Sequence, residues 1–541
     1  MDTPRGGPAA IGLHRRINHL TTVPYPDDRS VTDLFEDAVR RFPDAVAVVH
    51  GDTEVRYGEL NRLADRLARR LRADGVRPGA VVGVCVDRSV GMVAALLAVL
   101  KCGAAYLPFD AAWPGTRLRR LFDVAGCEVL VTDRPDALAA RFPGRRVTPV
   151  TGGEDGDADG GKDSGKDGDA GGGEDGDADV AVGPDDIAYI NFTSGSTGTP
   201  KGVPIRHRAI TRLVFGARYA PLDERTTLLQ LAPVTFDAAT FEIWGALLHG
   251  GTCVLYPSAF LRLSELGQVL RARSVTVLFL TTALFNTVVD EAPDVLDGVP
   301  TVLTGGEAHS LPHMARALRR YGPGRVVHVY GPTECTTFAT YHPVRELPDG
   351  TSLPIGLPVQ NTRAYVVGED GRLCGPGETG ELLVGGPGLS PGYLSLPDAT
   401  RERFVELDVD GRVRRLYRTG DLVHAREDGA LVFEGREDGQ VKVDGHRVEL
   451  GEVGHHLNDH PQVRQSHVTT VPTATGGRAL VAFVVPRSPE CTAALLREHL
   501  RARLPAFMVP SDIRFLAALP LTPHGKVDRR ALPAAEGGAR S

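Results

Sequence analysis

The hydrophobic pattern of the first part of the chain alternates between helical and extended periods. Leucines recur at helical spacing within residues 58–75, and a glycine closes that segment. The apolar run 80–86 is typical of a buried strand, a serine can cap a second helix over 89–102, and residues 106–109 predict another strand. This alternation predicts an α/β domain built from layers of sheet and helix.

Further apolar strands are predicted in the middle of the chain. They cover residues 275–280, 299–303 and 326–330, and turn residues follow each of them. Strand ends of this kind meet at one edge of an open sheet, where ligands usually bind. We therefore expect one crevice to be shared by these strand ends.

Residues 151–180 have a composition unlike the rest of the chain. They are almost wholly Gly, Asp, Glu, Lys and Ala, and the octet GGEDGDAD occurs twice, at 152–159 and 172–179. A segment of this composition cannot bury apolar surface, so we expect a disordered, solvated loop. The segment holds eleven acidic residues and two lysines, whereas the net charge of the whole chain is only -7. The excess of acidic residues in the chain therefore lies in this segment. No basic field remains that would indicate nucleic-acid binding.

The pattern changes again beyond about residue 420, where short strands are joined by Asp-Gly turns at 428–429, 438–439 and 444–445. A strand over 479–485, a helix over 493–503 and a proline-rich tail follow. We expect three parts: a linker-like segment 1–30, a large domain 31–435 and a small C-terminal domain 436–541. A chain of 541 residues is long enough for two cores.

Several features suggest a cytoplasmic protein. The seven cysteines are scattered singly, so we expect neither disulfides nor a zinc site. The N-terminal residues lack an apolar signal-peptide core, and the longest apolar run, 92–100, is too short to span a bilayer. We expect no membrane association.

The segment 192–202, FTSGSTGTPKG, concentrates hydroxyls, glycines and one lysine directly after an apolar strand. Glycines let backbone N–H groups approach an anion, hydroxyls donate further hydrogen bonds, and Lys201 adds a positive charge. It is not a Walker A motif, because the required spacing is absent. On composition alone a flexible linker remains an alternative to a phosphate-binding loop.

This loop resembles the signature loop of the adenylate-forming superfamily, and nine other segments resemble family motifs in the same order. They are VRYGEL (55–60), LKCGAAYLPFD (100–110), FDAAT (236–240), VYGPTE (329–334), GELLVGGPGLSPGYL (380–394), YRTGDL (417–422), GREDGQVKVDGHRVELGE (435–452), LPAFMVP (504–510) and HGKVDR (524–529). The resemblance covers nearly the whole chain and is specifically to adenylation domains of nonribosomal peptide synthetases. It implies the adenylate-forming fold, with a large layered N-terminal domain and a small, mobile α+β domain.

The resemblance also implies an ATP site. Tyr330 would stack on adenine, Asp421 would bind the ribose hydroxyls with Arg436 nearby, Glu334 would hold Mg²⁺, and Thr333 would contact a phosphate. The full set expected to bind nucleotide is Thr193, Ser194, Gly195, Ser196, Thr197, Gly198, Lys201, Gly306, Tyr330, Gly331, Thr333, Asp421, Arg436 and Lys526.

Catalysis is expected to involve Lys526 together with Thr333 and Glu334. Lys526 matches the family lysine that bridges the substrate carboxylate and the ATP oxygens, although His524 stands where the family prefers Asn. Asp438 matches the hinge about which the small domain rotates between two half-reactions, and Lys442 lies in the segment expected to face the site after rotation.

Asp237 identifies an amino acid as the expected substrate, because it resembles the family carboxylate that pairs with an α-ammonium group; a helix N-cap is the alternative. By motif alignment the substrate pocket is formed by Asp237, Ala238, Phe241, Phe279, Leu303, Gly305, Val329, Thr337, Phe338 and Lys526. The side-chain positions carry no charge, and we expect a small aliphatic substrate: isoleucine, valine or 2-aminobutyrate.

No carrier-protein module follows Arg530, so we expect a phosphopantetheine thiol on a separate carrier protein to accept the activated amino acid. Residues 17–35 resemble the linker between condensation and adenylation domains. Some relatives need an MbtH-like helper protein, which is a further candidate partner. The alternatives are an acyl- or aryl-CoA synthetase of the same chemistry and an inactive ATP-binding scaffold.

Overall fold

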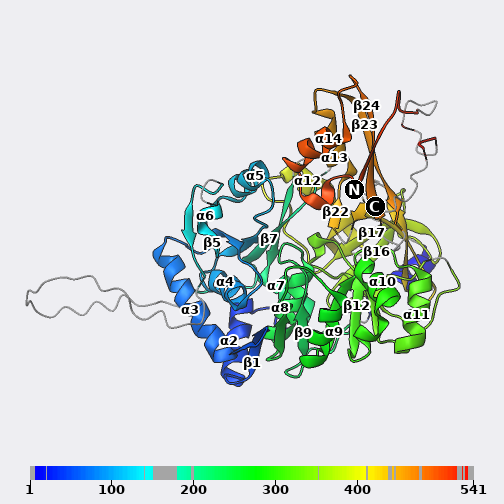
Figure 1. The fold of residues 1–541 in the computed structure, drawn as a ribbon. Coiled ribbons are helices and arrows are strands. Elements are labelled where there is room, and N and C mark those ends of the chain that lie inside the picture. The colour runs from blue at the N-terminus through cyan, green and yellow to red at the C-terminus, as the bar shows by residue number, and fades with distance from the viewer. Residues whose placement is uncertain are drawn as a thin grey trace, which may run out of the picture.

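The computed structural model describes residues 7–19, 21–138, 141–149, 180–195, 200–350, 352–409, 412–436, 441–443, 446–473, 478–520, 527 and 531–533. The acidic segment 151–179, Ser196, Thr197, Gly198, Asp438 and Lys526 lie outside these residues. In Figure 1 a large body, blue to yellow, carries a smaller part in orange and red that contains α13, α14, β23 and β24.

A nine-stranded sheet forms one layer of the large body. Its central six strands are parallel, and antiparallel strands complete both edges. Across the sheet the order is β15 (Leu357–Pro358), β14 (Thr340–Pro343), β13 (Val326–Tyr330), β12 (Thr301–Gly305), β11 (Val277–Thr281), β9 (Thr227–Gln230), β10 (Thr252–Leu255), β1 (Val46–His50) and β2 (Thr53–Arg56).

Two further sheets complete the large body. One has the order β6 (Arg145–Val147), β5 (Cys127–Thr132), β3 (Val81–Cys85), β4 (Ala105–Pro108), β7 (Ile187–Thr193) and β8 (Lys201–Arg206). The other is antiparallel and contains β16 (Arg363–Val367), β17 (Thr379–Gly385), β19 (Arg412–Ala425), β18 (Phe404–Val409) and β20 (Leu431–Arg436).

Helices pack between and around the sheets. The α-helices of the large body are α1 (Pro8–His19), α2 (Val31–Arg41), α3 (Tyr57–Ala73), α4 (Val90–Lys101), α5 (Gly115–Ala125), α6 (Pro135–Leu138), α7 (His207–Val214), α8 (Ala238–Leu247), α9 (Leu263–Ala272), α10 (Thr282–Glu291), α11 (Leu311–Tyr321) and α12 (Pro397–Arg403). Short 3₁₀ turns lie at Pro293–Leu296, Thr333–Cys335 and Ala506–Met508. Helix α4 contacts β1 of the nine-stranded sheet and β3 and β4 of the six-stranded sheet, which explains why it is apolar all round. None of the helices in the described ranges is long and apolar enough to cross a membrane.

The small part has its own core. A three-stranded sheet, β23 (Val463–Pro472), β24 (Arg478–Pro486) and β25 (Asp512–Phe515), packs with α13 (Leu450–Asn458) and α14 (Ala493–Arg501). The hairpin of β21 (Val441–Val443) and β22 (His446–Val448) also contributes apolar side chains to this core. Strand β20, which ends at Arg436, still pairs with β19 of the large body.

Most elements predicted from periodicity are present within a few residues. The helix expected over 58–75 is α3, the strand over 80–86 is β3, and the strand over 326–330 is β13. Ser89 caps α4 as expected, since its hydroxyl accepts a hydrogen bond from the Met92 amide at 3.1 Å. The α/β class and the division into a large and a small part are confirmed.

The segment expected as a linker contains helix α1, which the sequence patterns did not indicate. Leu13 and Ile17 on one face are buried, and Asn18 pairs with the backbone of Ala364 through both its amide oxygen and its amide nitrogen, at 2.9 and 3.0 Å. Two apolar residues four apart are too short a pattern to reveal a helix. The side-chain amide fixes α1 to β16 because it satisfies backbone groups at that strand.

Candidate active site

A cavity of about 690 Å³ opens where the carboxyl ends of the parallel strands β11, β12 and β13 face the small part. This is the crevice that the strand pattern predicted. Fourteen of the expected site residues line it: Thr193, Ser194, Asp237, Ala238, Phe279, Gly306, Val329, Tyr330, Gly331, Thr333, Thr337, Phe338, Asp421 and Arg436.

Five further expected residues, Phe241, Leu303, Gly305, Gly195 and Lys201, lie behind or beside this wall. Phe241 is buried and packs against Phe338 with ring centroids 5.4 Å apart, so it supports the cavity wall from behind. Leu303 is buried on β12, and at Gly305 a side chain would meet the Val329 carbonyl oxygen at 2.0 Å. Gly305 is therefore required for the close approach of β12 to β13.

One group of the cavity-lining residues is suited to bind a ribose. The Tyr330 hydroxyl donates to Asp421, and Arg436 pairs with the same carboxylate. Arg436 also donates to the Thr419 carbonyl at 3.0 Å, and the Asp421 amide donates to the Thr419 hydroxyl at 3.0 Å. These contacts hold the carboxylate rigidly against the wall, next to an aromatic ring on which a base can stack.

The cavity lining contains a second buried carboxylate, that of Asp237. Asp237 is only 8% exposed and stands at the N-cap position of α8, but its side chain makes no capping hydrogen bond. Burial raises its pKa, and a hydrogen bond from the Thr333 hydroxyl and the charge of Lys442 partly offset this. A buried carboxylate that does not cap its helix is suited to a cationic ligand, so the helix-cap alternative loses its physical basis here.

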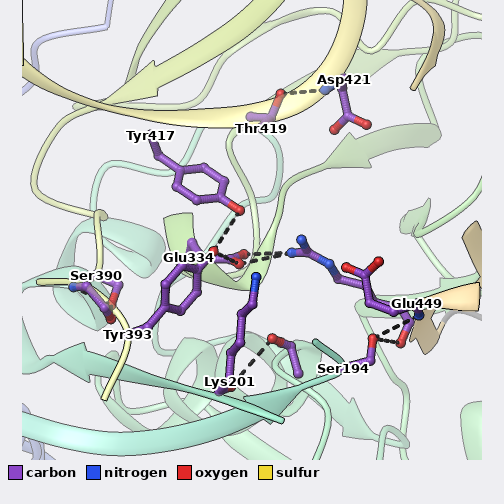
Figure 2. A network of polar contacts seen from close by, with 12 residues as sticks. Ser194, Lys201, Glu334, Ser390, Tyr393, Tyr417, Thr419, Asp421 and Glu449 are labelled. Carbon is purple, nitrogen blue, oxygen red and sulfur yellow. Dashed lines mark hydrogen bonds and ion pairs between the residues drawn. The ribbon is translucent and has the colours of Figure 1, made fainter. Parts of the chain in front are cut away.

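Glu334 lies at the centre of a buried polar network beside the phosphate loop (Figure 2). Its two carboxylate oxygens accept hydrogen bonds from Arg447 at 3.0 Å each, and the Tyr393 hydroxyl donates to one of them at 2.7 Å. Burial acts to raise the pKa of Glu334, but Arg447 and Tyr393 outweigh it, and the pKa lies below its usual range. Lys201 completes this cluster with its ammonium 5.1 Å from the centre of the Tyr393 ring.

The small part reaches the site through the β21–β22 hairpin and the start of α13. The Ser194 hydroxyl donates to the Arg447 carbonyl at 2.8 Å and accepts from the Glu449 amide at 3.2 Å. Lys442 lines the cavity near Asp237 and Asp421, and burial lowers its pKa despite these two carboxylates. The hairpin segment therefore faces the site in this arrangement.

Arg447, Arg117 and Glu452 are site residues that sequence reasoning did not single out. Arg117 of α5 pairs with Glu452 of α13 at 3.0 Å, and both side chains are buried. The Arg117–Glu452 pair and the Arg447–Glu334 pair each join residues that are far apart in the chain and lie in different parts of the molecule. The only sequence signal was that Arg447 and Glu452 lie within the motif at 435–452.

The residues of this site fit a magnesium ion only together with a nucleotide. Within the described ranges no group of three or more His, Cys, Asp or Glu side chains is placed to hold a metal. Mg²⁺ is commonly held by one or two carboxylates plus phosphate oxygens and water, so the single carboxylate of Glu334 is an adequate protein ligand. In this arrangement the Arg447 guanidinium forms an ion pair with the Glu334 carboxylate.

Comparison with known proteins places the chain in a family. A model described as AMP-binding enzyme matches residues 35–394, and one described as AMP-binding enzyme C-terminal domain matches residues 452–526. Malpibaldin synthetase of Mortierella alpina is 39% identical, over 95% of this chain and 9% of that protein. Surfactin synthase subunit 1 of Bacillus subtilis (strain 168) is 38% identical, over 94% of this chain and 14% of that protein. The chain thus spans a small fraction of these curated relatives.

Solved structures agree with this assignment. PA1221, described as an NRPS protein containing adenylation and PCP domains, is 32% identical with a TM-score of 0.78, covering 94% of this chain and 97% of that chain. The amide bond synthetase McbA from Marinactinospora thermotolerans is 25% identical with a TM-score of 0.79, covering 93% and 98%. The chain therefore belongs to the AMP-binding enzyme family, as an adenylation domain of the nonribosomal peptide synthetase type.

Proposed function

We propose that this chain activates a small aliphatic amino acid with ATP and passes it to a phosphopantetheine thiol on a separate carrier protein. The observation that carries the proposal is Asp237, a buried carboxylate that lines the same cavity as Asp421 and Tyr330. The ammonium group of a bound amino acid would compensate the Asp237 carboxylate for the hydration that it lost on burial. The carboxylate of the amino acid would then lie towards the nucleotide.

The wall beside Asp237 supports a short apolar side chain. Phe279, Val329 and Phe338 line it, with Ala238 and Thr337, and no charged residue stands among them. Phe338 lies between Phe279 and Phe241, at 5.8 and 5.4 Å between ring centroids, so the volume left is limited by packed rings. The side chain of isoleucine, valine or 2-aminobutyrate would fit against such a wall. One methylene group changes the binding free energy by only about 1 to 3 kcal/mol, so discrimination among these three amino acids is weak.

In the first half-reaction the amino-acid carboxylate attacks the α-phosphorus of ATP. A carboxylate–phosphorus bond forms, the bond to the bridging oxygen breaks, and pyrophosphate leaves with the electron pair. The nucleophile is already ionised near neutral pH, so no general base is required. Lys526 and Thr333 would stabilise the developing charge. Mg²⁺ held by Glu334 would neutralise phosphate charge.

In the second half-reaction a thiol sulfur attacks the adenylate carbonyl and a carbon–sulfur bond forms. The carbon–oxygen bond to AMP breaks, AMP leaves with the electron pair, and the thiol proton is released to solvent. In the arrangement described above the hairpin lines the cavity and Arg447 pairs with Glu334. This arrangement suits the second half-reaction, because the Glu334 carboxylate is not needed there to hold Mg²⁺. Asp438 would act as the hinge between the two arrangements. Transfer to a carrier in trans, and help from an MbtH-like protein, are parts of this proposal.

The proposal is tested by trapping the activated acid with hydroxylamine and measuring AMP release, using valine or isoleucine and the matching acids that lack the amine. Hydroxamate from the amino acids alone is expected. Hydroxamate from the simple carboxylic acids alone would contradict the role of Asp237 and favour an acyl-CoA synthetase, which free coenzyme A as acceptor would then reveal.

A further inference from the structure

A buried arginine of α7 holds the turn 335–338, which directly follows Glu334. Arg212 is 0% exposed, and its guanidinium donates hydrogen bonds to the backbone carbonyls of Cys335, Thr336 and Phe338. The bonds to Phe338 and Thr336 measure 2.8 and 3.2 Å. A guanidinium presents five N–H donors in a planar fork, so it can serve several carbonyls of one turn at once.

This guanidinium is buried among neutral acceptors. Besides the three carbonyls it donates to the Thr362 hydroxyl at 3.3 Å, and the structure pairs it with no carboxylate among the described residues. At Gly388 a side chain would meet the Arg212 guanidinium at 1.9 Å, so this glycine leaves the space that the guanidinium fills. Burying a charge without a counter-ion is costly, which indicates that the turn needs this fork of donors.

The turn itself is strained. Thr336 and Thr337 have φ angles of 58° and 66°, in the left-handed region that β-branched residues rarely adopt. The Thr336 hydroxyl donates to the Gly388 carbonyl at 2.8 Å, and the Thr337 hydroxyl donates to the Asp237 carbonyl at 2.9 Å. Strained residues of this kind persist where the surroundings hold them, and they cluster at functional sites.

The held turn contains part of the proposed amino-acid pocket. Thr337 and Phe338 line the cavity together with Asp237. Because the Thr337 hydroxyl binds the Asp237 backbone, the turn connects the wall for the side chain to the carboxylate proposed for the ammonium group. A shift of the turn would therefore change both contacts of the amino acid at once.

We propose that Arg212 is a positioning residue for amino-acid selectivity, which acts by clamping the strained turn 335–338. This inference rests on the proposed function, because it concerns the same pocket. Arg212 does not itself line the cavity. It acts through the places of Thr337 and Phe338, since a wall discriminates by size only if it does not move.

Arg212→Lys keeps the charge and removes the fork. The discrimination between the preferred amino acid and its homologue one methylene longer, as a ratio of kcat/KM, should fall by about fivefold or more, because a firm apolar wall gives only about 10- to 200-fold. The KM for ATP should change less than about threefold. Arg208→Lys is the matched control one turn earlier on α7, where Arg208 pairs with Asp185 at 2.7 Å, and it should keep the wild-type ratio.

Thr336→Gly tests the same turn without loss of folding. Glycine adopts the φ of this position without strain, so the melting temperature should not fall. The hydroxyl bond to Gly388 is lost, however, and the turn is free to move. We expect the same loss of discrimination as in Arg212→Lys.

Hydrogen exchange tests the clamp without any substrate. The amides of Phe338 and Ala339 donate to the carbonyls of Thr336 and Tyr330 at 2.9 and 2.7 Å. In both variants these amides should exchange at least about tenfold faster, with no change in α3.

Unchanged discrimination in both variants, or unchanged protection of these amides, would overturn the inference. An equal loss of kcat/KM for both amino acids would also overturn it, because that would show support of the fold alone. If the wild type exchanged no pyrophosphate with any amino acid, the proposed function would fail, and hydrogen exchange would still decide whether Arg212 clamps the turn.

Discussion

Asp237 is buried, and its side chain does not cap the helix that follows it. The α8 helix begins at Ala238 without a capping bond from this side chain, and burial raises its pKa. Natural cores place an ionised carboxylate out of water only when a partner compensates it. Thr333 and Lys442 compensate it in part, and a substrate ammonium would complete the compensation.

Asp237→Asn keeps the shape of the side chain and removes its charge. We expect the KM for the amino acid to rise by about 100- to 1,000-fold, because breaking a buried ion pair costs about 3 to 5 kcal/mol. The KM for ATP should stay nearly constant. Steady-state exchange kinetics with both substrates varied will measure this, and an unchanged amino-acid KM would refute the assignment.

Lys526 lies outside the described residues, and its role rests on the motif HGKVDR. Lys526→Ala should reduce adenylate formation by on the order of 100-fold or more, the loss typical of one electrostatic group at a reacting centre. Nucleotide binding, measured by equilibrium titration of ATP, should change little. Full adenylation activity in this variant would remove Lys526 from the mechanism.

At the scale of elements, the β21–β22 hairpin connects the small part to the phosphate loop and to Glu334. Its Arg447 engages both oxygens of the Glu334 carboxylate, and its backbone carbonyl accepts from Ser194. A carboxylate engaged in this way is a weaker metal ligand, because the adjacent guanidinium charge repels a cation and uses part of the acceptor capacity of the carboxylate. The hairpin and Mg²⁺ are therefore expected to occupy Glu334 in different half-reactions.

Arg447→Gln should separate those half-reactions. Transfer of a preformed adenylate to a pantetheine thiol should slow by about tenfold or more, because the arrangement that Arg447 stabilises is lost. Amino-acid-dependent exchange should change less than about threefold. Rapid-quench assays of the two steps will decide, and an equal loss in both would contradict the alternation.

At the scale of the whole molecule, the site is a cavity between two parts with separate cores. The large body supplies strand ends and the phosphate loop, and the small part supplies the hairpin and α13. Residues of both parts line this cavity. Motion of the small part is thus a direct means of changing which groups face the substrate.

The acidic segment should contribute nothing to this cavity. Deleting residues 152–179 is expected to leave turnover within about twofold, because a segment of this composition buries no apolar surface. Exchange kinetics and a melting curve of the shortened chain will check it. A large loss of turnover without loss of folding would reveal a role for the segment.

Local patterns predicted α3, α4 and β13, because a helical period, a strand period and a serine cap each depend only on residues that are close together in the sequence. The crevice followed from strand ends, and motif order predicted most of its lining. Contacts such as Arg447 with Glu334 could not be foreseen, since they depend on how two separate parts pack. The position of Phe241 behind Phe338 likewise depends on tertiary packing that a motif alignment does not encode.

Amino-acid-dependent exchange of labelled pyrophosphate into ATP tests the central claim most directly. It should be run across the twenty common amino acids, 2-aminobutyrate and several simple carboxylic acids. We expect the highest exchange with valine, isoleucine or 2-aminobutyrate and none with acids that lack the amine. Exchange driven only by simple carboxylic acids, or no exchange with any amino acid even in the presence of an MbtH-like protein, would contradict the account.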